Sequence, residues 1–389
     1  MNKIYLDKPI VSVEWLNQKL DASNLIILNA TMNKVTDPKS AQSSIQIPKA
    51  RFFDIKITFS NVSDPFPNAV PSENQFTKEA QKLGINKDSA IVVYDDKGIY
   101  SSARVWWLFK AFSHENVSVL DGGLPEWINC TYKTEPKKQL KVKQGDFVGI
   151  YNPKYFKFFK DIQNSIKNKK ELILDARSSD RFNGLVEEPR EGLRSGHIPK
   201  SKNLPYTVLF DENKLKSEKD LNSIFDTFDS NDKNLIFSCG SGITACILAL
   251  GADIAGYTKL SVYDGSWTEY GSLTKDNVMT KNVHWTKQEL VAYILLYASQ
   301  SDMIVSNKER NVIISKVDMK TFQKIRDEFD EDNDYQSIQK IMSGLKEHNY
   351  SKMDIDLLFA DIKGLFFADG EFDQLEKNMF RLLKKLLGK

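Results

Sequence analysis

An internal repeat constrains the fold of this chain more than any other feature. One copy starts at Ile91 and reads IVVYDDKGIYSSARVWWLFKAFSHENVSVLDGGLPEW, and the other starts at Leu235 and reads LIFSCGSGITACILALGADIAGYTKLSVYDGSWTEY. Each copy has a buried-type strand, a polar or glycine-bearing loop, a helix, a second β-branched strand and an Asp-Gly turn with a Trp beyond it. Strands that alternate with helices predict βαβ units and a parallel sheet. In this alignment Asp95 matches Cys239.

The repeat extends upstream and defines the domain organisation. The stretches LIILNA and QIPKARFFDI of the first copy match LILDAR and GHIPKSKNLPY of the second. We therefore expect two α/β domains with parallel sheets flanked by helices, over residues 1–140 and 150–275. Beyond them, apolar residues recur at helical spacing, which predicts an all-α domain over residues 286–389. Its expected helices are ELVAYILLYAS, MKTFQKIRDEF, YQSIQKIMSGL, MDIDLLFADIKGLFF and LEKNMFRLLKKLL.

Composition excludes several classes of protein. Hydrophobic residues make up 41% and charged residues 27% of the 389 positions, so the chain folds rather than staying disordered. The net charge of +2 argues against nucleic acid or an anionic membrane as the main partner. No apolar run approaches the ~20 residues that cross a bilayer. The N-terminus, MNKIYLDKPIVSVEWLNQKL, has no signal-peptide or transit-peptide pattern, so we expect a cytoplasmic protein.

The three cysteines do not form the framework of a disulfide-rich protein, and one of them has a chemical context. Cys239 follows an apolar strand and precedes a helix in IFSCGSGITA, where glycines permit a loop whose N–H groups converge on one point. The helix N-terminus adds partial positive charge, so we expect a thiol with a lowered pKa and nucleophilic character. The alternative is a small buried hydrophobe. Cys246 is expected in the core, and Cys130 has no chemical context.

With these residues in view, the repeated region resembles the tandem rhodanese-fold sulfurtransferases, and the loop CGSGIT resembles the active-site loop of the 3-mercaptopyruvate sulfurtransferases. The stretches DGGLPEW, DGSWTEY, GHIPKSKNLP, FFDI, YSSARVWWLFKAF and RFNGLVEEPREG carry the same resemblance. It implies that Cys239 accepts sulfur as a persulfide and passes it to an acceptor. Because the loop has no basic residue after the cysteine, 3-mercaptopyruvate is favoured over thiosulfate as the donor. The implied persulfide-cradle loop comprises Gly240, Ser241, Gly242, Ile243 and Thr244.

Within this loop, two hydroxyl residues join Cys239 as candidate catalytic residues. Ser241 could donate a hydrogen bond to the attacking or leaving sulfur, and Thr244 is expected to fix the loop at the helix start.

Arginines are the candidate ligands of an anionic donor. Arg181 and Arg190 lie in RFNGLVEEPR, and guanidinium groups are well suited to a planar carboxylate. The resemblance implies that they bind the carboxylate and carbonyl of the donor. The alternative is that they pair with Glu187, Glu188 or Glu191. Arg104 is a further candidate for lining the cleft, or else it pairs with an acid.

The sequence also departs from the family pattern in the first domain. Asn68 stands where related enzymes carry a His, and Lys56 stands where an acid is expected, so no His–Asp relay can be assembled. Asn68 can form hydrogen bonds to substrate but cannot shuttle a proton at neutral pH. Activation then relies on the loop and helix dipole alone, or the natural donor differs. Asp95 replaces the nucleophile, so the first domain is expected to be inactive and to supply one wall of the cleft.

The C-terminal segment carries a second resemblance. The stretches SQSDMIVSNKE and FADGEFDQLE are similar to the helix-turn repeats of tellurite-resistance TerB-like domains. Asp369, Asp373 and Glu376 could bind a divalent cation through oxygen ligands, although Asp-Gly before a helix is also an ordinary turn with an N-terminal cap. His284 and His348 have no partner at metal spacing, and we expect no cofactor.

The sequence therefore predicts a sulfurtransferase that moves sulfur from 3-mercaptopyruvate to a thiol or cyanide through a Cys239 persulfide, with thioredoxin or a low-molecular thiol as the implied acceptor. Two alternatives stay open. One is a thiosulfate sulfurtransferase, and the other is a non-catalytic persulfide-carrying or stress-sensing adaptor.

Overall fold

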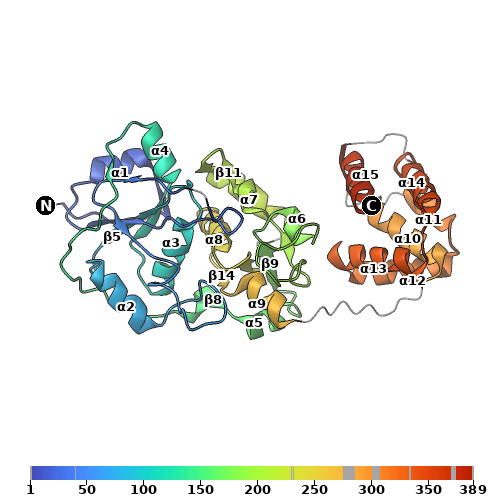
Figure 1. Cartoon of the computed structure of the whole chain (residues 1–389), viewed down its shortest axis with the longest axis horizontal. Coiled ribbons are helices and arrows are strands. Elements are labelled where there is room, and N and C mark those ends of the chain that lie inside the picture. Colours follow the sequence, from blue (N-terminus) through green and yellow to red (C-terminus); the bar gives the residue numbers. More distant parts are fainter. Residues whose placement is uncertain are drawn as a thin grey trace. The chain divides into compact units, whose positions relative to one another are not determined.

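The computed structural model describes residues 2–39, 41–228, 230, 232–274, 285–299, 307–332, 334–368 and 374–387. Its contacts divide the chain into two compact units, Met1–Thr274 and Lys275–Lys389. Figure 1 shows the sheets in the first unit and helices in the second.

The first unit contains two five-stranded sheets with the same topology. The strand order is β1-β6-β5-β2-β4 in one and β8-β14-β13-β9-β10 in the other, and all neighbouring strands are parallel. The first sheet comprises β1 (Ile10–Val11), β2 (Leu25–Asn29), β4 (Arg51–Phe52), β5 (Ala90–Tyr94) and β6 (Val117–Leu120). The second comprises β8 (Phe156–Lys157), β9 (Glu171–Asp175), β10 (Lys202–Asn203), β13 (Asn234–Ser238) and β14 (Leu260–Tyr263).

The central strands place the repeat's special residues at equivalent edges. Both strands are apolar runs: β5 is buried throughout, and β13 is buried from its second residue, as expected for parallel strands covered on both faces. Asp95 follows β5 directly, and Cys239 follows β13 directly. The predicted duplication of a parallel α/β architecture is therefore confirmed.

Helices cover the sheets, and one helix from each repeat packs against the other. The first repeat contains α1 (Val13–Lys19), α2 (Glu73–Lys82), α3 (Ser102–Ala111) and α4 (Gly123–Asn129). The second contains α5 (Phe159–Ser165), α6 (Ser179–Phe182), α7 (Glu218–Asp226), α8 (Ala245–Ile254) and α9 (Ser266–Leu273). Helices α3 and α8 contact each other, and one hydrophobic cluster includes Trp106 and Trp107 of α3 together with Ile247 and Leu250 of α8. The two repeats thus share a core.

Short elements complete the first unit. They are the antiparallel pairs β3 (Ile45–Gln46) with β7 (Glu135–Pro136) and β11 (Phe210–Asp211) with β12 (Lys214–Leu215), and the 3-10 turns Pro153–Tyr155 and Tyr206–Leu209.

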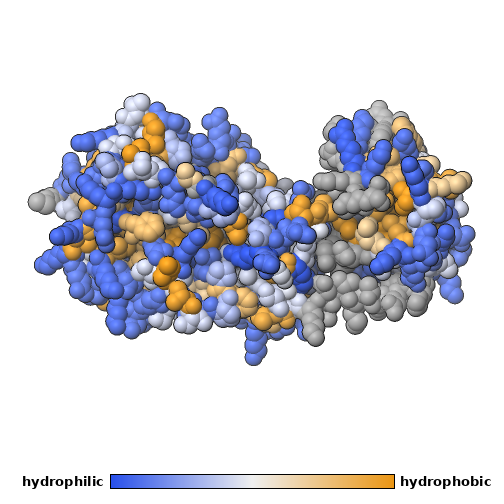
Figure 2. All heavy atoms as spheres, in the orientation of Figure 1, coloured by the Kyte–Doolittle hydropathy of each residue, from blue (hydrophilic) through white to orange (hydrophobic). Residues whose placement is uncertain are grey.

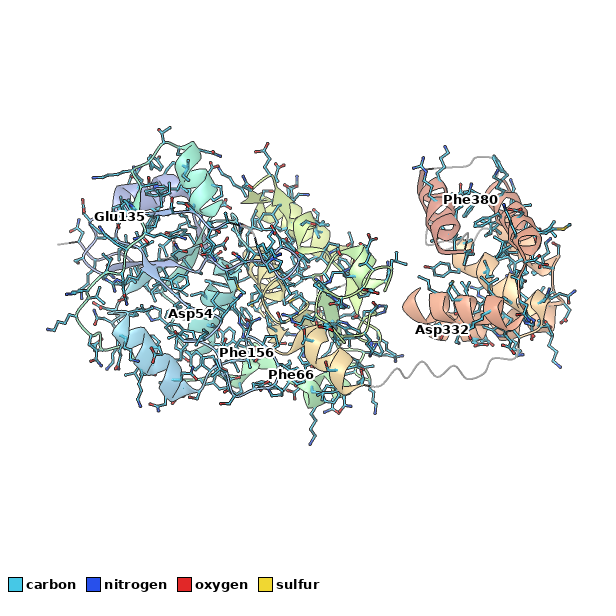
Figure 3. The ribbon with its side chains drawn as sticks, viewed as in Figure 1. Asp54, Phe66, Glu135, Phe156, Asp332 and Phe380 are labelled. Atoms are coloured by element: carbon cyan, nitrogen blue, oxygen red, sulfur yellow. The ribbon has the colours of Figure 1, made fainter. Side chains whose placement is uncertain are left out.

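The second unit is helical, as predicted. Its described elements are α10 (Lys287–Ala298), α11 (Asn307–Ile314), α12 (Met319–Glu331), α13 (Asp334–Glu347), α14 (Lys352–Phe366) and α15 (Gln374–Leu387). Thr286 and Glu289 form a capping box that starts α10, and this helix contacts each of the other five. Asp332, labelled in Figure 3, accepts a hydrogen bond from the Tyr293 hydroxyl at 2.6 Å and pairs with Lys340 at 2.6 Å. The helices therefore pack around α10.

In the described ranges, no helix combines the length and the apolar character required to cross a membrane. Figure 2 shows mostly hydrophilic residues on this face of the first unit, with hydrophobic residues scattered among them.

Candidate active site

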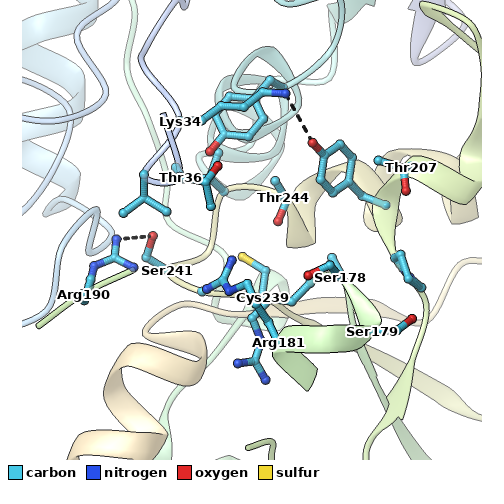
Figure 4. Close-up of a pocket in the computed structure, with 18 residues that line it drawn as sticks. Lys34, Thr36, Ser178, Ser179, Arg181, Arg190, Thr207, Cys239, Ser241 and Thr244 are labelled. Carbon is cyan, nitrogen blue, oxygen red and sulfur yellow. Dashed lines mark hydrogen bonds between the residues drawn. The ribbon is translucent and has the colours of Figure 1, made fainter. Parts of the chain in front are cut away.

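Cys239 lies at the wall of a cavity of about 430 Å³ that both repeats line. The residue is only 1% exposed, and its loop connects β13 to α8. Arg181 and Arg190 of the second repeat and Tyr100 of the first line the same cavity. Figure 4 shows the Cys239 sulfur with Arg181 and Arg190 near it.

Ser266 holds the Cys239 loop in place through its hydroxyl group, a role that was not predicted from the sequence. Its Oγ accepts the backbone N–H of Cys239 at 3.1 Å and of Gly242 at 3.2 Å, and donates to the Tyr263 carbonyl at 2.8 Å. The same Oγ lies 3.9 Å from the Cys239 sulfur. One signal was available, because the first repeat has Gly123 where the second has Ser266.

Close packing against the turn before α9 explains the glycine at position 242. Gly242 has a φ of +74°, and a Cβ there would lie 2.6 Å from the Asp264 carbonyl oxygen. A side chain is therefore excluded by both conformation and space. Thr268 completes the support by donating its N–H and its hydroxyl to the Gly240 carbonyl, at 2.9 and 2.5 Å.

The corresponding loop of the first repeat binds an anion of its own. One oxygen of the buried Asp95 carboxylate accepts N–H groups from Tyr100, Ser101 and Ser102 at 2.8, 2.9 and 2.9 Å. The other oxygen accepts the N–H of Lys97 at 2.9 Å. The backbone of this strand-to-helix loop therefore forms a cradle for negative charge, and Asp95 fills it.

The Cys239 loop presents the same donors. Helix α3 begins at Ser102 and α8 begins at Ala245, so the amides of Ile243, Thr244 and Ala245 match those that hold Asp95. Within the part of the chain that the structure describes, these three amides have no hydrogen-bond acceptor. They are therefore available to an anion on the Cys239 side chain.

Ser241 connects the loop to both neighbouring segments. Its Oγ accepts hydrogen bonds from Arg190 Nη2 and from Asn68 Nδ2, each at 3.0 Å. Because both lone pairs are used, the Ser241 hydroxyl proton can be donated elsewhere. Asn68 has a φ of +63°, a conformation that asparagine tolerates, and it lines an adjacent cavity of about 690 Å³ rather than the cavity of Cys239.

Arg104 lies behind the loop and does not line the Cys239 cavity. It is 1% exposed and donates from Nη2 to Asp264 at 2.6 Å and to the Asn68 carbonyl at 2.8 Å. Nη1 donates to the Gly242 carbonyl at 3.4 Å. The guanidinium also lies 4.8 Å from the ring centroid of Phe156, which Figure 3 labels. This placement corrects the predicted cleft-lining role, because a buried cation needs an acid partner and Asp264 supplies it.

Arg181 lines the cavity, but its charge is balanced. Its Nε and Nη2 donate to the two oxygens of Glu188 at 3.0 and 2.6 Å. Glu188 also pairs with Arg177 at 2.9 Å, and Arg177 pairs with Asp175 at 2.7 Å. Two carboxylates thus neutralise two guanidinium groups. The predicted alternative, pairing with Glu188, holds for Arg181 while it still faces the cavity.

Arg190 differs from Arg181 because it has no carboxylate partner among the described residues. Its Nη1 is buried without a hydrogen-bond acceptor. Burial lowers the pKa of Arg190, and the nearby Cys239 acts in the opposite direction. Since a buried cation gains most from an anion, Arg190 is the guanidinium best placed to bind an anionic ligand in this cavity.

Lys34 is a second cation at the cavity, and it was not predicted. It follows β2 in the first repeat, and its Nζ lies 3.5 Å from the Tyr206 hydroxyl and 5.2 Å from the centroid of the Tyr100 ring. In Figure 4 it lies above the Cys239 sulfur, whereas Arg190 lies to the left of that sulfur. A cation after the carboxyl end of a parallel strand was the signal available in the sequence.

Two predicted roles in and near the loop have different outcomes. Thr244 is the N-cap residue of α8 but makes no side-chain cap hydrogen bond, so its hydroxyl does not fix the loop in the predicted way and instead lines the cavity. Cys246 is fully buried, its Sγ donates to the Gly242 carbonyl at 3.3 Å, and burial raises its pKa to about 12. It is therefore a thiol of the core.

The weak metal-site hypothesis lies mostly outside the described residues. Asp369, Asp373 and His284 lie outside the described residues. Glu376 is described and is a buried residue of α15. Where the chain is described, no group of three or more His, Cys, Asp or Glu side chains could hold a metal ion.

Comparison with known proteins relates this geometry to a family. The family model described as "Rhodanese-like domain" matches residues 12–130 and 159–273. The chain is 38% identical to "Thiosulfate/3-mercaptopyruvate sulfurtransferase 1, mitochondrial" of Arabidopsis thaliana, over 70% of this chain and 78% of that one. It is 35% identical to the 3-mercaptopyruvate sulfurtransferase of Escherichia coli K12, over 67% and 94%. A crystal structure of the E. coli 3-mercaptopyruvate sulfotransferase aligns with a TM-score of 0.60 and 32% identity, covering 67% of this chain and 99% of that one.

Proposed function

The chain belongs to the rhodanese-like family that includes the 3-mercaptopyruvate sulfurtransferases, and from this premise we propose that it transfers sulfur from 3-mercaptopyruvate to a thiol through a Cys239 persulfide. One observation carries the assignment of the nucleophile. The loop of the first repeat holds the Asp95 carboxylate with three convergent amides, and the matching loop has the same amides beside a thiol. A persulfide anion on Cys239 would occupy the place of that carboxylate.

In the first half-reaction, the Cys239 thiolate attacks the sulfur of 3-mercaptopyruvate. A sulfur–sulfur bond forms, the carbon–sulfur bond breaks, and its electron pair passes to carbon as the enolate of pyruvate. The enolate takes up the proton of the transferred sulfhydryl group, which leaves pyruvate and a Cys239 persulfide anion. Ser241 can donate its hydroxyl proton as a hydrogen bond while charge moves between the sulfurs.

Arg190 binds the donor carboxylate in this proposal. Its Nη1 is a buried donor without an acceptor, and its Nη2 holds Ser241, so one guanidinium links the donor to the loop. Arg181 contributes less charge because two of its five N–H groups are used by Glu188. We expect Arg190→Ala to lower kcat/KM for 3-mercaptopyruvate. The loss should correspond to about 1.5–3 kcal/mol of transition-state stabilisation, the usual value of a charged hydrogen bond. Arg190→Lys should restore part of the loss.

The test measures both half-reactions on the full chain. Protein is mixed with 3-mercaptopyruvate, pyruvate release is followed, and intact mass is measured for a gain of one sulfur atom. The gain should be absent in Cys239→Ser and present in Cys246→Ser. Thiosulfate in place of 3-mercaptopyruvate tests the alternative donor. An adduct without turnover when a thiol is added would favour a persulfide-carrying adaptor, and no adduct with either donor would refute the proposal.

Several expectations rest on the sequence alone and stay predictions. They are the domain limits 1–140, 150–275 and 286–389, a TerB-like character for the helical unit, thioredoxin as a protein acceptor and a cytoplasmic location. The family match ends at residue 273 and does not extend into the helical unit.

A further inference from the structure

One cation that lines the Cys239 cavity, Lys34, does not bind the donor in the proposed first half-reaction. Lys34, Arg177, Arg181 and Arg190 line this cavity, and no carboxylate lines it within the described chain. Arg177 and Arg181 are neutralised by acids behind the wall. Two uncompensated cations remain, whereas 3-mercaptopyruvate carries one carboxylate, which Arg190 binds.

Lys34 is held by aromatic side chains in a position distinct from that of Arg190. Its ammonium lies over the Tyr100 ring and within 3.5 Å of the Tyr206 hydroxyl, and no described carboxylate lies within ion-pair distance. Ring and hydroxyl reduce its freedom without cancelling its charge. The Tyr206 hydroxyl remains able to donate a hydrogen bond to a bound anion beside the ammonium.

The position of Lys34 also matches the approach path of a second molecule. It lines the 430 Å³ cavity of Cys239, the 690 Å³ cavity and a further one of about 380 Å³, so it lies where these three spaces adjoin. In Figure 4 the ammonium of Lys34 and the guanidinium of Arg190 lie in different directions from the Cys239 sulfur, Lys34 above it and Arg190 to its left. A molecule that binds at Lys34 would therefore reach the outer sulfur of the persulfide from a direction different from that of the donor carboxylate.

We propose that Lys34, with Tyr206, forms an acceptor subsite that selects small thiols carrying a carboxylate. The inference rests on the proposed function and deepens it. In the second half-reaction the acceptor thiolate attacks the outer sulfur, a new sulfur–sulfur bond forms on the acceptor, and the bond to Cys239 breaks. The Cys239 thiolate leaves, and the acceptor departs as its persulfide. Lys34 binds the acceptor carboxylate and does not touch the reacting atoms, so it determines specificity rather than catalysis.

Three thiols of similar size and different charge test this subsite. 3-Mercaptopropionate carries a carboxylate, 2-mercaptoethanol is neutral and cysteamine carries an ammonium group. Each discharges the preformed Cys239 persulfide, and the ratio of variant to wild-type kcat/KM for one thiol cancels that thiol's own nucleophilicity. We expect Lys34→Gln to lower the value for 3-mercaptopropionate about tenfold, mainly through KM, and to leave 2-mercaptoethanol within about twofold. Lys34→Glu should reverse the preference toward cysteamine, and Lys34→Arg should restore the wild-type order.

Control variants and the donor reaction separate the possible outcomes. Lys39→Gln removes an exposed charge from the same segment and should change none of the three ratios. Lys34→Gln should form the persulfide from 3-mercaptopyruvate with an unchanged KM. A rise in that KM with unchanged acceptor ratios would overturn the inference and assign Lys34 to the donor. Equal loss for all three thiols would overturn it in favour of a structural role. Absence of a persulfide in the wild type would instead refute the proposed function.

Discussion

Replacement of Ser266 by alanine tests whether the support beneath the Cys239 loop sets its reactivity. The Ser266 hydroxyl is the acceptor for two buried amides, those of Cys239 and Gly242. Each buried amide left without an acceptor costs about 1–3 kcal/mol, and the loop can relax in part. We therefore expect the free energy of unfolding to fall by about 2–4 kcal/mol. Because small displacements of reacting groups are expensive, persulfide formation should slow by about 10-fold to 100-fold.

A second substitution separates stability from loop geometry. Ser266 has a φ of +50°, a conformation that costs a non-glycine residue about 1–2 kcal/mol. Ser266→Gly removes the same hydroxyl but relieves this strain, as Gly123 does at the matching position of the first repeat, where φ is +53°. Ser266→Gly should therefore be more stable than Ser266→Ala by about 1 kcal/mol, yet equally slow in forming the persulfide.

The assay combines urea unfolding with single-turnover release of pyruvate. Ser102→Ala is the matched control, because the Ser102 hydroxyl is buried without a hydrogen-bond partner and its removal leaves no group unsatisfied. It should change stability by less than about 0.5 kcal/mol and leave the rate unchanged. A Ser266→Ala protein that forms the persulfide within about twofold of the wild-type rate would refute the reasoning.

Three further outcomes follow from the first repeat. Asp95→Asn should lower the free energy of unfolding by about 2–3 kcal/mol in urea, because an amide NH₂ would face a backbone donor; unchanged stability would contradict the cradle. Asn68→His should leave single-turnover pyruvate release at neutral pH within about threefold, whereas a larger rise would show that proton transfer limits the rate. Burial lowers the pKa of His114 below its ordinary 6.5, so the unfolded state binds more protons as the pH falls. Stability should therefore decline below about pH 6.5 in urea titrations, and His114→Gln should lack that part of the slope.

Much of the fold followed from sequence because its determinants are local and repeated. Apolar runs mark β5 and β13, helical periodicity marks the second unit, and the duplicated pattern itself indicates two similar sheets. The helices expected from periodicity did not include α11, because its stretch NKERNVII begins with five polar residues and shows no clear apolar repeat.

The site was only partly predictable because its decisive contacts join distant residues. Arg181 and Arg190 were equivalent in sequence. The difference between them depends on which of the three nearby glutamates turns inward, and the structure shows that it is Glu188, which is buried and pairs with Arg181. Ser266 reaches Cys239 through the turn after the next strand, and Lys34 enters from the other repeat. Periodicity and composition carry no information on such side-chain contacts between residues that are distant in the sequence.

The position of Arg104 has a consequence for how the two halves can evolve. This side chain belongs to the repeat without a nucleophile, yet it is bonded to Gly242 and Asp264 around the nucleophile of the other repeat. A mutation in the first repeat that shifts the start of α3 would therefore also displace a contact of the loop that carries Cys239. The first repeat therefore supports the loop that carries Cys239 in the second. Neither half can drift independently, and the catalytic half should not be expected to work as an excised domain.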